Sequence, residues 1–355
     1  MSSNNFSRGD FINLGIASGI SSFNTNLFAE QTTSSSPKTV SHKGLLYYYH
    51  PDFLKHDTGR HHPERPERLQ SINLVLKEMI DNKTLQQFTP TQSKLKNVLL
   101  CHGKDYIDSV LEDIKKGKPR LSTGDTSISG LPSLNAALLA VGAGTQAVDA
   151  IMQGKHKRAF VACRPPGHHA CPNKGMGFCI FNNIGIAARY AQKNYGLERV
   201  LIIDWDVHHG NGTQDIFYDD PSVFFFSSHQ WPQYPGTGAE KETGSGKAIG
   251  TTMNRTFPAN SGRKEVYGAM KNDLVPAMEK FKPEMIFISA GFDSRVNDPL
   301  GRFNLTDKDF ADMTQLCVDM ANKHCEGRIL SMLEGGYNLE GLALATRAHV
   351  EALAL

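Results

Sequence analysis

Residues 199–212 read RVLIIDWDVHHGNG, and the kind of sheet that the chain forms can be inferred from them. Its apolar part, residues 200–203, is followed at once by carboxylates and imidazoles. A strand that is apolar throughout, rather than alternating, is typical of a parallel sheet covered by helices on both faces. Placing Asp204, Asp206 and His208 at its end would cost desolvation free energy unless a cation is present. The stretch therefore predicts a buried strand with a metal site at its carboxyl end.

Similar short apolar or aromatic runs recur along the chain, separated by longer segments with apolar residues every three or four positions. This alternation predicts βα units that build a mainly parallel sheet, in a three-layer α/β sandwich with helices on both faces. The expected strands are residues 45–49, 159–163, 199–204, 223–227, 285–290 and 329–333. The expected helices are residues 65–80, 134–152, 182–195, 263–280, 307–323 and 339–353.

Polar clusters follow five of the expected strands, at residues 164–169, 204–211, 227–229, 291–293 and 334–337. Open α/β sheets bind ligands in the crevice beyond the carboxyl ends of their strands. We therefore expect these clusters to converge on one site.

The spacing of Asp206 and His208 predicts that both side chains lie on the same side of an extended segment and bind one metal ion. Asp293, in the segment SAGFD, supplies a third ligand just past another apolar strand. Two oxygens and one nitrogen leave a position for water, which marks a catalytic metal site. Taken alone, the cluster could also be a buried hydrogen-bond network.

A metal neutralised by two carboxylates is a weaker Lewis acid, so such a site needs further catalytic residues. His168 and His169 are adjacent in a proline-stiffened loop, which indicates proton carriers rather than satisfied loop residues. Tyr337 follows two glycines in EGGYN and could donate a hydrogen bond to a developing oxyanion, although a lone tyrosine there would usually be packing.

Seven motifs in this order resemble the histone deacetylase and acetylpolyamine amidohydrolase superfamily, which shares its fold with the arginases. They are HPERPER at 62–68, RPPGHHA at 164–170, GFCIFNN at 177–183, DWDVHHGNG at 204–212, SAGFD at 289–293, DPLG at 298–301 and EGGYN at 334–338. The resemblance spans residues 44–355. The second and fourth motifs look like the class II branch of histone deacetylases, and Tyr337 is similar to the tyrosine of its active members.

The resemblance implies a role for each matched position in catalysis. The zinc ligands would be Asp206, His208 and Asp293. His169 would be the general base and later the acid, with His168, held by Asp204, as its electrostatic partner. Asn211 stands behind His169, where class I relatives carry an aspartate. Members also bind potassium beneath the zinc, which here implies Asp204, Asp206, His208, Ser227 and Ser228.

The resemblance also implies a tunnel for the acyl-lysine side chain. Gly177 and Phe178 would line it opposite Tyr234, where many relatives have phenylalanine. Leu300 takes the place of the gatekeeper at the mouth, where polyamine-selective members have glutamate. The remaining implied contacts are Gly336 in the tyrosine turn, Asp125 holding the substrate backbone, and Arg68 beside an internal cavity for acetate.

These features predict a zinc-dependent deacetylase acting on acetyl-lysine in proteins or peptides, with histones among the candidate substrates. The alternative is an amidohydrolase for acetylpolyamines or other small acetylated amines, which present the same acetamide. Arginase-like hydrolysis would need ligands for a second metal, which we do not find in the sequence. A non-catalytic acyl-lysine binding module would have lost the tyrosine or a ligand. Iron(II) suits an Asp-His-Asp set as well as zinc does.

Composition excludes other classes of partner and scaffold. A net charge of +2 with 21% charged residues gives no basic excess for a nucleic-acid partner. Six cysteines without CxxC spacing indicate neither a disulfide scaffold nor a cysteine-based zinc site. No run approaches the ~18 apolar residues that cross a bilayer, so we expect no membrane partner. The oligomeric state stays open.

Residues 1–40 are rich in Ser, Asn and Thr and lack apolar periodicity. The segment from Ser7 resembles a twin-arginine export signal, with a small-residue cleavage site at Ala29, but Gly9 stands where the second arginine belongs. The expectation is a disordered tail or a degenerate export signal before a catalytic domain at 41–355. The protein is accordingly expected to be cytoplasmic or exported.

Overall fold

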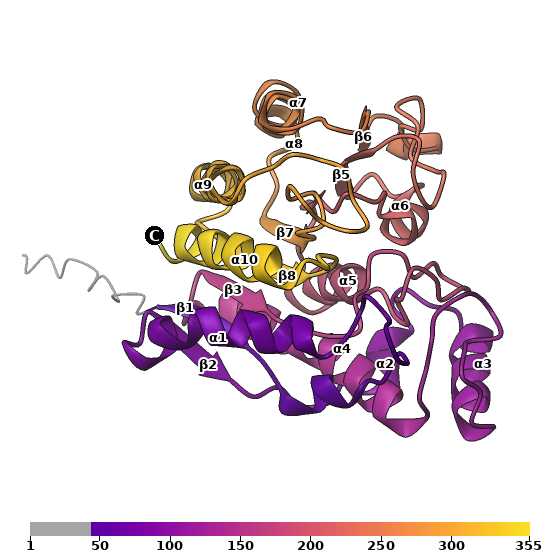
Figure 1. The fold of residues 1–355 in the computed structure, drawn as a ribbon. Coiled ribbons are helices and arrows are strands. Elements are labelled where there is room, and N and C mark those ends of the chain that lie inside the picture. The colour runs from indigo at the N-terminus through magenta and orange to yellow at the C-terminus, as the bar shows by residue number, and fades with distance from the viewer. Residues whose placement is uncertain (1–43) are drawn as a thin grey trace, which may run out of the picture. The chain divides into compact units, whose positions relative to one another are not determined.

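A computed structural model describes residues 44–355 (Figure 1), so both interpretations of residues 1–40, and the boundary expected after them, lie outside the described residues. Its eight strands form one sheet in the order β2-β1-β3-β8-β7-β4-β5-β6. Every neighbouring pair is parallel, which confirms the expected α/β class. The strands are β1 Leu45–Tyr48, β2 Leu85–Phe88, β3 Arg158–Val161, β4 Val200–Asp204, β5 Val223–Gln230, β6 Thr252–Phe257, β7 Met285–Ala290 and β8 Ile329–Leu333.

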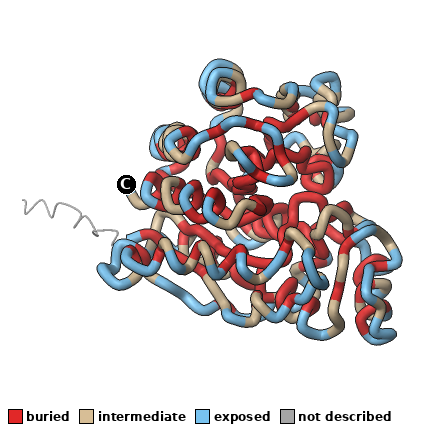
Figure 2. Tube along the Cα trace, viewed as in Figure 1, coloured by how far each residue is buried: buried red, intermediate tan, exposed pale blue. Residues whose placement is uncertain are grey.

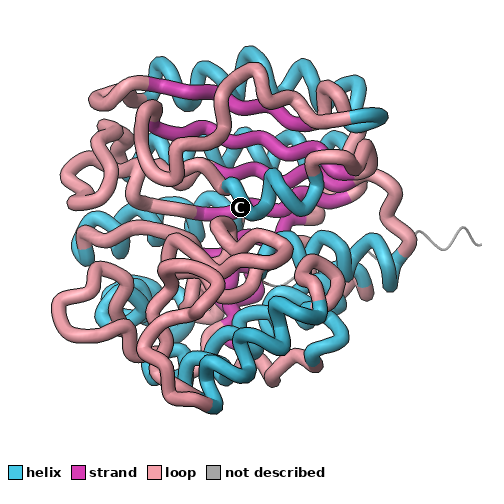
Figure 3. Tube along the Cα trace, turned by 90° about the vertical axis from the view of Figure 1, so that its right-hand side faces the viewer, coloured by secondary structure: helices cyan, strands magenta, loops and turns pink. Residues whose placement is uncertain are grey.

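Helices cover the sheet on both faces, as Figure 3 shows in cyan around the magenta strands. Helix α10 packs on α1 and α9, and α9 also contacts α7, whereas α4 packs on α5 across the sheet from them. The helices are α1 Glu67–Asp81, α2 Leu95–Val98, α3 Lys104–Lys115, α4 Leu131–Met152, α5 Asn183–Tyr195, α6 Asn211–Phe217, α7 Arg263–Ala269, α8 Val275–Phe281, α9 Asp307–His324 and α10 Leu339–Ala354.

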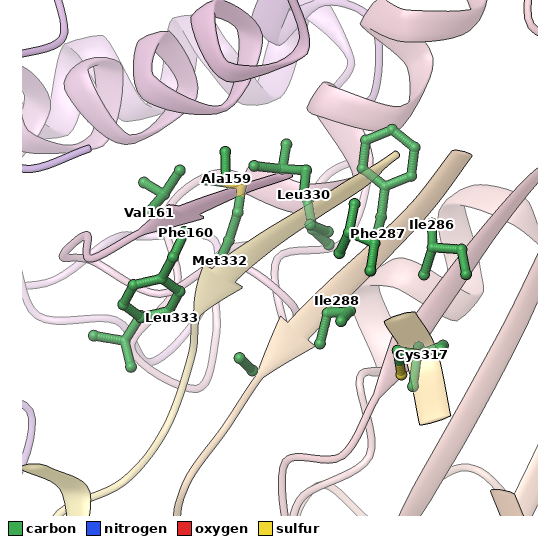
Figure 4. Close-up of a cluster of buried hydrophobic side chains, with 14 of the residues drawn as sticks. Ala159, Phe160, Val161, Ile286, Phe287, Ile288, Cys317, Leu330, Met332 and Leu333 are labelled. Carbon is green, nitrogen blue, oxygen red and sulfur yellow. The ribbon is translucent and has the colours of Figure 1, made fainter. Parts of the chain in front are cut away.

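The central strands are buried along their whole length, as the red interior of Figure 2 shows. Leu330 of β8 and Phe287 of β7 lie side by side on one face of the sheet, and Phe160 of β3 lies on the other face (Figure 4). Apolar surface removed from water contributes roughly 25 cal/mol per Å², so this core is the main stabilising term. It holds the carboxyl ends of the central strands in fixed positions.

The helix expected at 263–280 is interrupted, because the turn Met270–Leu274 has π-helical hydrogen bonding between α7 and α8. Pro276, in the first turn of α8, has no N–H to continue a regular ladder, which accounts for the change of pattern. The two edge strands β2 and β6 and the helices α2, α3 and α6 were not predicted from the sequence.

One helix among residues 44–355, α4, is long and apolar enough to cross a membrane by length and composition. The sequence of α4 contains polar residues such as Asn135, Gln146 and Asp149, so it is not an unbroken apolar run. Within the fold, 72% of the most apolar part of α4 is buried, and the helix packs on α5 and the sheet.

Candidate active site

Five adjacent strands of the sheet, β3, β8, β7, β4 and β5, end at one rim. The segments that follow them carry the polar clusters found in the sequence. In the register of the sheet, Asp204 at the end of β4 lies between Ser289 of β7 and Ser227 of β5. The parallel order thus gathers residues that are more than 150 positions apart in the chain.

The side chains of Asp206, His208 and Asp293 form a buried cluster whose ligand atoms all lie within 4.8 Å of one another. Nδ1 of His208 is 3.0 Å from Oδ1 of Asp206 and 3.2 Å from Oδ2 of Asp293. A side chain at Gly335 could not fit, because its Cβ would lie 2.0 Å from Oδ2 of Asp293. The glycine lets the β8 loop close over the two carboxylates.

The donor set fits a divalent metal ion. Oδ2 of Asp293 is buried and accepts no hydrogen bond of good geometry from residues 44–355. The other carboxylate oxygens are oriented by backbone N–H groups, with Gly335 donating to Asp206 at 2.8 Å and Val207 donating to Asp293 at 2.9 Å. Burial, together with the charge of Asp206, raises the pKa of Asp293 to about 7. A cation would relieve this repulsion.

The rings of His168 and His169 lie beside the cluster with centroids 3.9 Å apart and planes tilted by 41°, but their partners differ. Nδ1 of His168 lies 2.9 Å from Oδ2 of Asp204, and Nδ1 of His169 lies 2.8 Å from Oδ1 of Asn211. Although burial opposes charge, Asp204 and Asp206 raise the pKa of His168 well above its usual range. Burial and the charge of His168 hold the pKa of His169 well below its usual range. The pair therefore combines one cationic and one neutral imidazole.

A cavity of about 260 Å³ leads from the surface to this cluster. It brings together every position expected in the tunnel except Gly336, and its lining is Asp125, His169, Gly177, Phe178, His208, Gln233, Tyr234, Leu300 and Tyr337. Gly177 has a φ of +56°, and a Cβ there would lie 2.2 Å from the ring of His169. Only glycine therefore lets the wall approach the imidazole so closely.

Tyr337 is buried and lines this cavity, with its ring edge-on to Phe178 at a centroid distance of 6.0 Å. Its backbone N–H donates to Oδ2 of Asp298 at 2.7 Å. The guanidinium of Arg68 lies 4.9 Å from the centre of the tyrosine ring and donates to the carbonyl of Gly336 at 2.6 Å. Burial raises the pKa of Tyr337 well above its usual range, so the hydroxyl stays protonated as a hydrogen-bond donor.

Arg68, implied to lie beside an acetate cavity, is fully buried in an ionic cluster. It donates to Glu64 at 3.2 Å and to the carbonyls of Gly336 and Glu334. Arg164 also pairs with Glu64, in part through a 2.8 Å hydrogen bond. These contacts assign Arg68 a part in holding the turn that carries Tyr337.

Three residues of the site were not predicted from the sequence. Asp298 lies in the DPLG motif but had received no role, although it fixes the Tyr337 turn. Glu334 accepts N–H groups of Gly167 and His168 at 2.7 and 3.1 Å, which positions the histidine loop. Gln233 lines the cavity. For Asp298 and Glu334, the available signal was a carboxylate within a family motif, whereas the sequence holds no such signal for Gln233.

Comparison with known proteins gives the same result as the geometry. Residues 62–353 match the histone deacetylase domain family. A probable deacetylase of Archaeoglobus fulgidus is 40% identical over 295 residues, which cover 82% of this chain and 81% of that protein. The chloroplastic histone deacetylase 10 of Oryza sativa subsp. japonica is 39% identical, covering 79% of this chain and 67% of the relative.

Two further comparisons concern a human relative and a solved structure. Human polyamine deacetylase HDAC10 is 36% identical over 325 residues, covering 87% of this chain but 48% of its own length. The crystal structure of the HDA15 HD domain superposes with a TM-score of 0.83 at 33% identity, covering 88% of this chain and 89% of that one. This chain therefore belongs to the histone deacetylase family, and its chemistry is that of a deacetylase.

Proposed function

We propose that the chain is a zinc-dependent amidohydrolase that removes acetyl groups from acetyl-lysine in proteins or peptides. The observation that carries this proposal is the cavity, which runs between Phe178 and Tyr234 to the Asp-His-Asp cluster and has Leu300 in its wall. Such a cavity admits a slender, uncharged acetamide and keeps a peptide backbone outside. Asp206, His208 and Asp293 would hold the zinc ion.

A zinc ion bound there would polarise the acetamide carbonyl and acidify a water molecule. His169, which burial keeps neutral, is the base that accepts a proton from the attacking water and later passes it to the leaving amine. His168 stays charged beside Asp204, and its positive charge favours the negative charge that develops on the carbonyl oxygen. The Tyr337 hydroxyl donates a hydrogen bond to the carbonyl oxygen as it becomes an oxyanion.

We also propose a potassium ion beneath the zinc, bound by Asp204, Asp206, His208, Ser227 and Ser228. The hydroxyl of Ser228 is buried and has no hydrogen-bond partner within residues 44–355, as expected for a group that binds a cation. Ser227 sits opposite Asp204 in the sheet register.

Acetyl-lysine is preferred over acetylpolyamines because of Leu300. An acetylated polyamine carries a second ammonium group, which would meet apolar surface at this position instead of a carboxylate. An acetyl-lysine side chain is uncharged and continues into neutral backbone. The second candidate substrate class is the acetylpolyamines, favoured by the 36% identity to a human protein named as a polyamine deacetylase.

The test compares kcat/KM of the full chain for an acetyl-lysine peptide, N-acetylspermidine and acetylputrescine, with and without a chelator. The expected ratio in favour of the peptide is at least about tenfold, or ~1.4 kcal/mol at the transition state. Chelation should abolish turnover of every substrate, and added zinc should restore it. A preference for an acetylpolyamine would replace the proposed substrate with the second candidate.

A further inference from the structure

The segment between β5 and the glycine-rich loop, residues 231–235, ties together two walls of the cavity mouth. Nε2 of Gln233 donates a 3.0 Å hydrogen bond to the carbonyl of Leu300. The hydroxyl of the next residue, Tyr234, donates to Oδ2 of Asp125 at 3.3 Å. Two adjacent side chains thus hold segments that lie 109 and 67 residues away in the chain.

Asp125 is the exposed carboxylate of this mouth, and both its oxygens are engaged. Oδ1 accepts the N–H of Gly177 at 2.9 Å, and Oδ2 accepts the Tyr234 hydroxyl. A carboxylate oxygen can accept more than one hydrogen bond, so each keeps capacity for a donor from a ligand. The Tyr234 hydroxyl and the Gly177 N–H fix the plane of the carboxylate, while the Asp125 residue remains exposed to solvent.

The ring of Tyr234 reaches inward from this hydrogen bond. Its centroid lies 5.2 Å from that of His169 and 6.2 Å from that of His208, edge-on to both. The aromatic body therefore builds the tunnel wall, and the hydroxyl alone makes the contact at the rim. These two roles can be separated, because phenylalanine keeps the ring and removes only the oxygen.

We infer that Tyr234 is a positioning residue for substrate recognition, whose hydroxyl holds Asp125 in place to accept backbone N–H groups of an acetyl-lysine peptide. This inference rests on the proposed function. Without the hydroxyl, Asp125 keeps one hydrogen bond and its carboxylate is free to rotate. The carboxylate must then be ordered when the substrate binds, and this entropy cost weakens substrate binding. The effect falls on substrates that offer backbone N–H donors, and it falls on KM rather than kcat.

The test is a double-mutant cycle with Tyr234→Phe and Asp125→Ala, assayed on two peptides. One is an acetyl-lysine tripeptide, and the other is the same peptide with the amide nitrogens of the acetyl-lysine and of the following residue methylated. Tyr234→Phe should lower kcat/KM for the unmethylated peptide by about tenfold, mostly through KM, as expected for a hydrogen bond to a charged group. It should change kcat/KM for the methylated peptide by less than about twofold. In the Asp125→Ala background it should have no further effect.

The matched control is Tyr195→Phe, which removes another tyrosine hydroxyl bonded to an aspartate, Asp149, at 2.7 Å at the far end of α5. This variant should retain the wild-type kcat/KM for both peptides. Equal losses for the two peptides with Tyr234→Phe, or losses that add to those of Asp125→Ala, would overturn the inference while leaving the proposed function intact. A wild-type enzyme inactive on the unmethylated peptide would overturn both.

Discussion

Nδ1 of His169 lies 2.8 Å from Oδ1 of Asn211, so the base of the site is paired with a neutral amide. The orientation of that amide is set from its other end, where Nδ2 donates to Sγ of Cys171 at 3.2 Å and to Sδ of Met176 at 3.5 Å. Since Oδ1 can only accept, His169 must carry its proton on Nδ1. Its Nε2 is then the free lone pair that general-base catalysis requires.

Replacing Asn211 with Asp would set a carboxylate against that Nδ1–H. A nearby negative charge favours the protonated imidazole, so the pKa of His169 should rise from its depressed value, and the acidic limb of the pH–rate profile should move to higher pH by about one unit or more. The profile of kcat/KM for an acetyl-lysine peptide measures this shift. Asn194→Asp adds the same charge at an exposed position on α5 and should leave the limb unmoved. An acidic limb that stays in place or falls in Asn211→Asp would contradict the role given to His169.

Tyr337→Phe should lower kcat by about a hundredfold or more, the usual cost of removing one oxyanion donor. Zinc content and thermal stability should remain those of the wild type, because the backbone contacts to Asp298 and Arg68 do not involve the hydroxyl. Steady-state kinetics with metal analysis of the same sample tests both statements. Wild-type turnover would remove Tyr337 from the mechanism.

Asp206→Ala and Asp293→Ala should each abolish zinc binding together with activity, since each variant removes one of three protein ligands. Metal content after dialysis against zinc measures the effect. Asp125→Ala is the matched control, because it removes a carboxylate from the same cavity without touching the cluster, and it should keep a full equivalent of zinc. Full occupancy in either cluster variant would show that the metal site lies elsewhere.

The sequence predicted the central strands well and the edges poorly, for a physical reason. Strands such as β4 and β7 are buried on both faces, so nearly all their residues are apolar and the run stands out. The edge strand β2 reads LQQF and has only one buried residue, so it contains no such run. Strand β6, with the sequence TMNRTF, is also only partly buried.

The same limit applies to the site. Residues that follow apolar strands, such as Asp206 and Asp293, can be recognised in the sequence because a buried carboxylate needs a partner that offsets its desolvation. Residues that act by accepting loop N–H groups, such as Asp298, depend on the path of a backbone that the sequence does not reveal. The contact between Tyr234 and Asp125 likewise exists only once two distant loops meet.

The ionic cluster below Tyr337 should make stability depend on pH. Although burial opposes ionisation of Glu64, Arg164 and Arg68 lower its pKa from 4.5 to about 2. A depressed folded-state pKa stabilises the protein above the unfolded value, and this contribution, about 3 kcal/mol by linkage, is lost as the pH falls from about 4.5 to 2. The difference in unfolding free energy between wild type and Glu64→Gln should therefore shrink over this range. Denaturant unfolding at a series of pH values measures this difference. The control is Glu112→Gln, which removes the carboxylate of an exposed ion pair with Lys116 and should give a small difference that hardly varies with pH. A difference for Glu64→Gln that is constant with pH would contradict the assignment of the charge to Glu64.

Leu300→Glu should shift the enzyme toward acetylpolyamines. The backbone of Leu300 is held independently of its side chain, by a 2.9 Å hydrogen bond from its N–H to Asp298 and by the Gln233 amide on its carbonyl. A glutamate there would present a carboxylate at the mouth for the second ammonium of acetylputrescine or N-acetylspermidine, so the kcat/KM ratio of peptide to polyamine should fall by about tenfold. Leu300→Gln has the same shape as Leu300→Glu without the charge and should change the ratio much less.

Because the attraction is between charges at a half-exposed rim, the change in this kcat/KM ratio should also become smaller as salt is raised from about 50 to 500 mM. Equal effects of glutamate and glutamine would mean that the side chain selects by size, and the electrostatic explanation of substrate choice would fail.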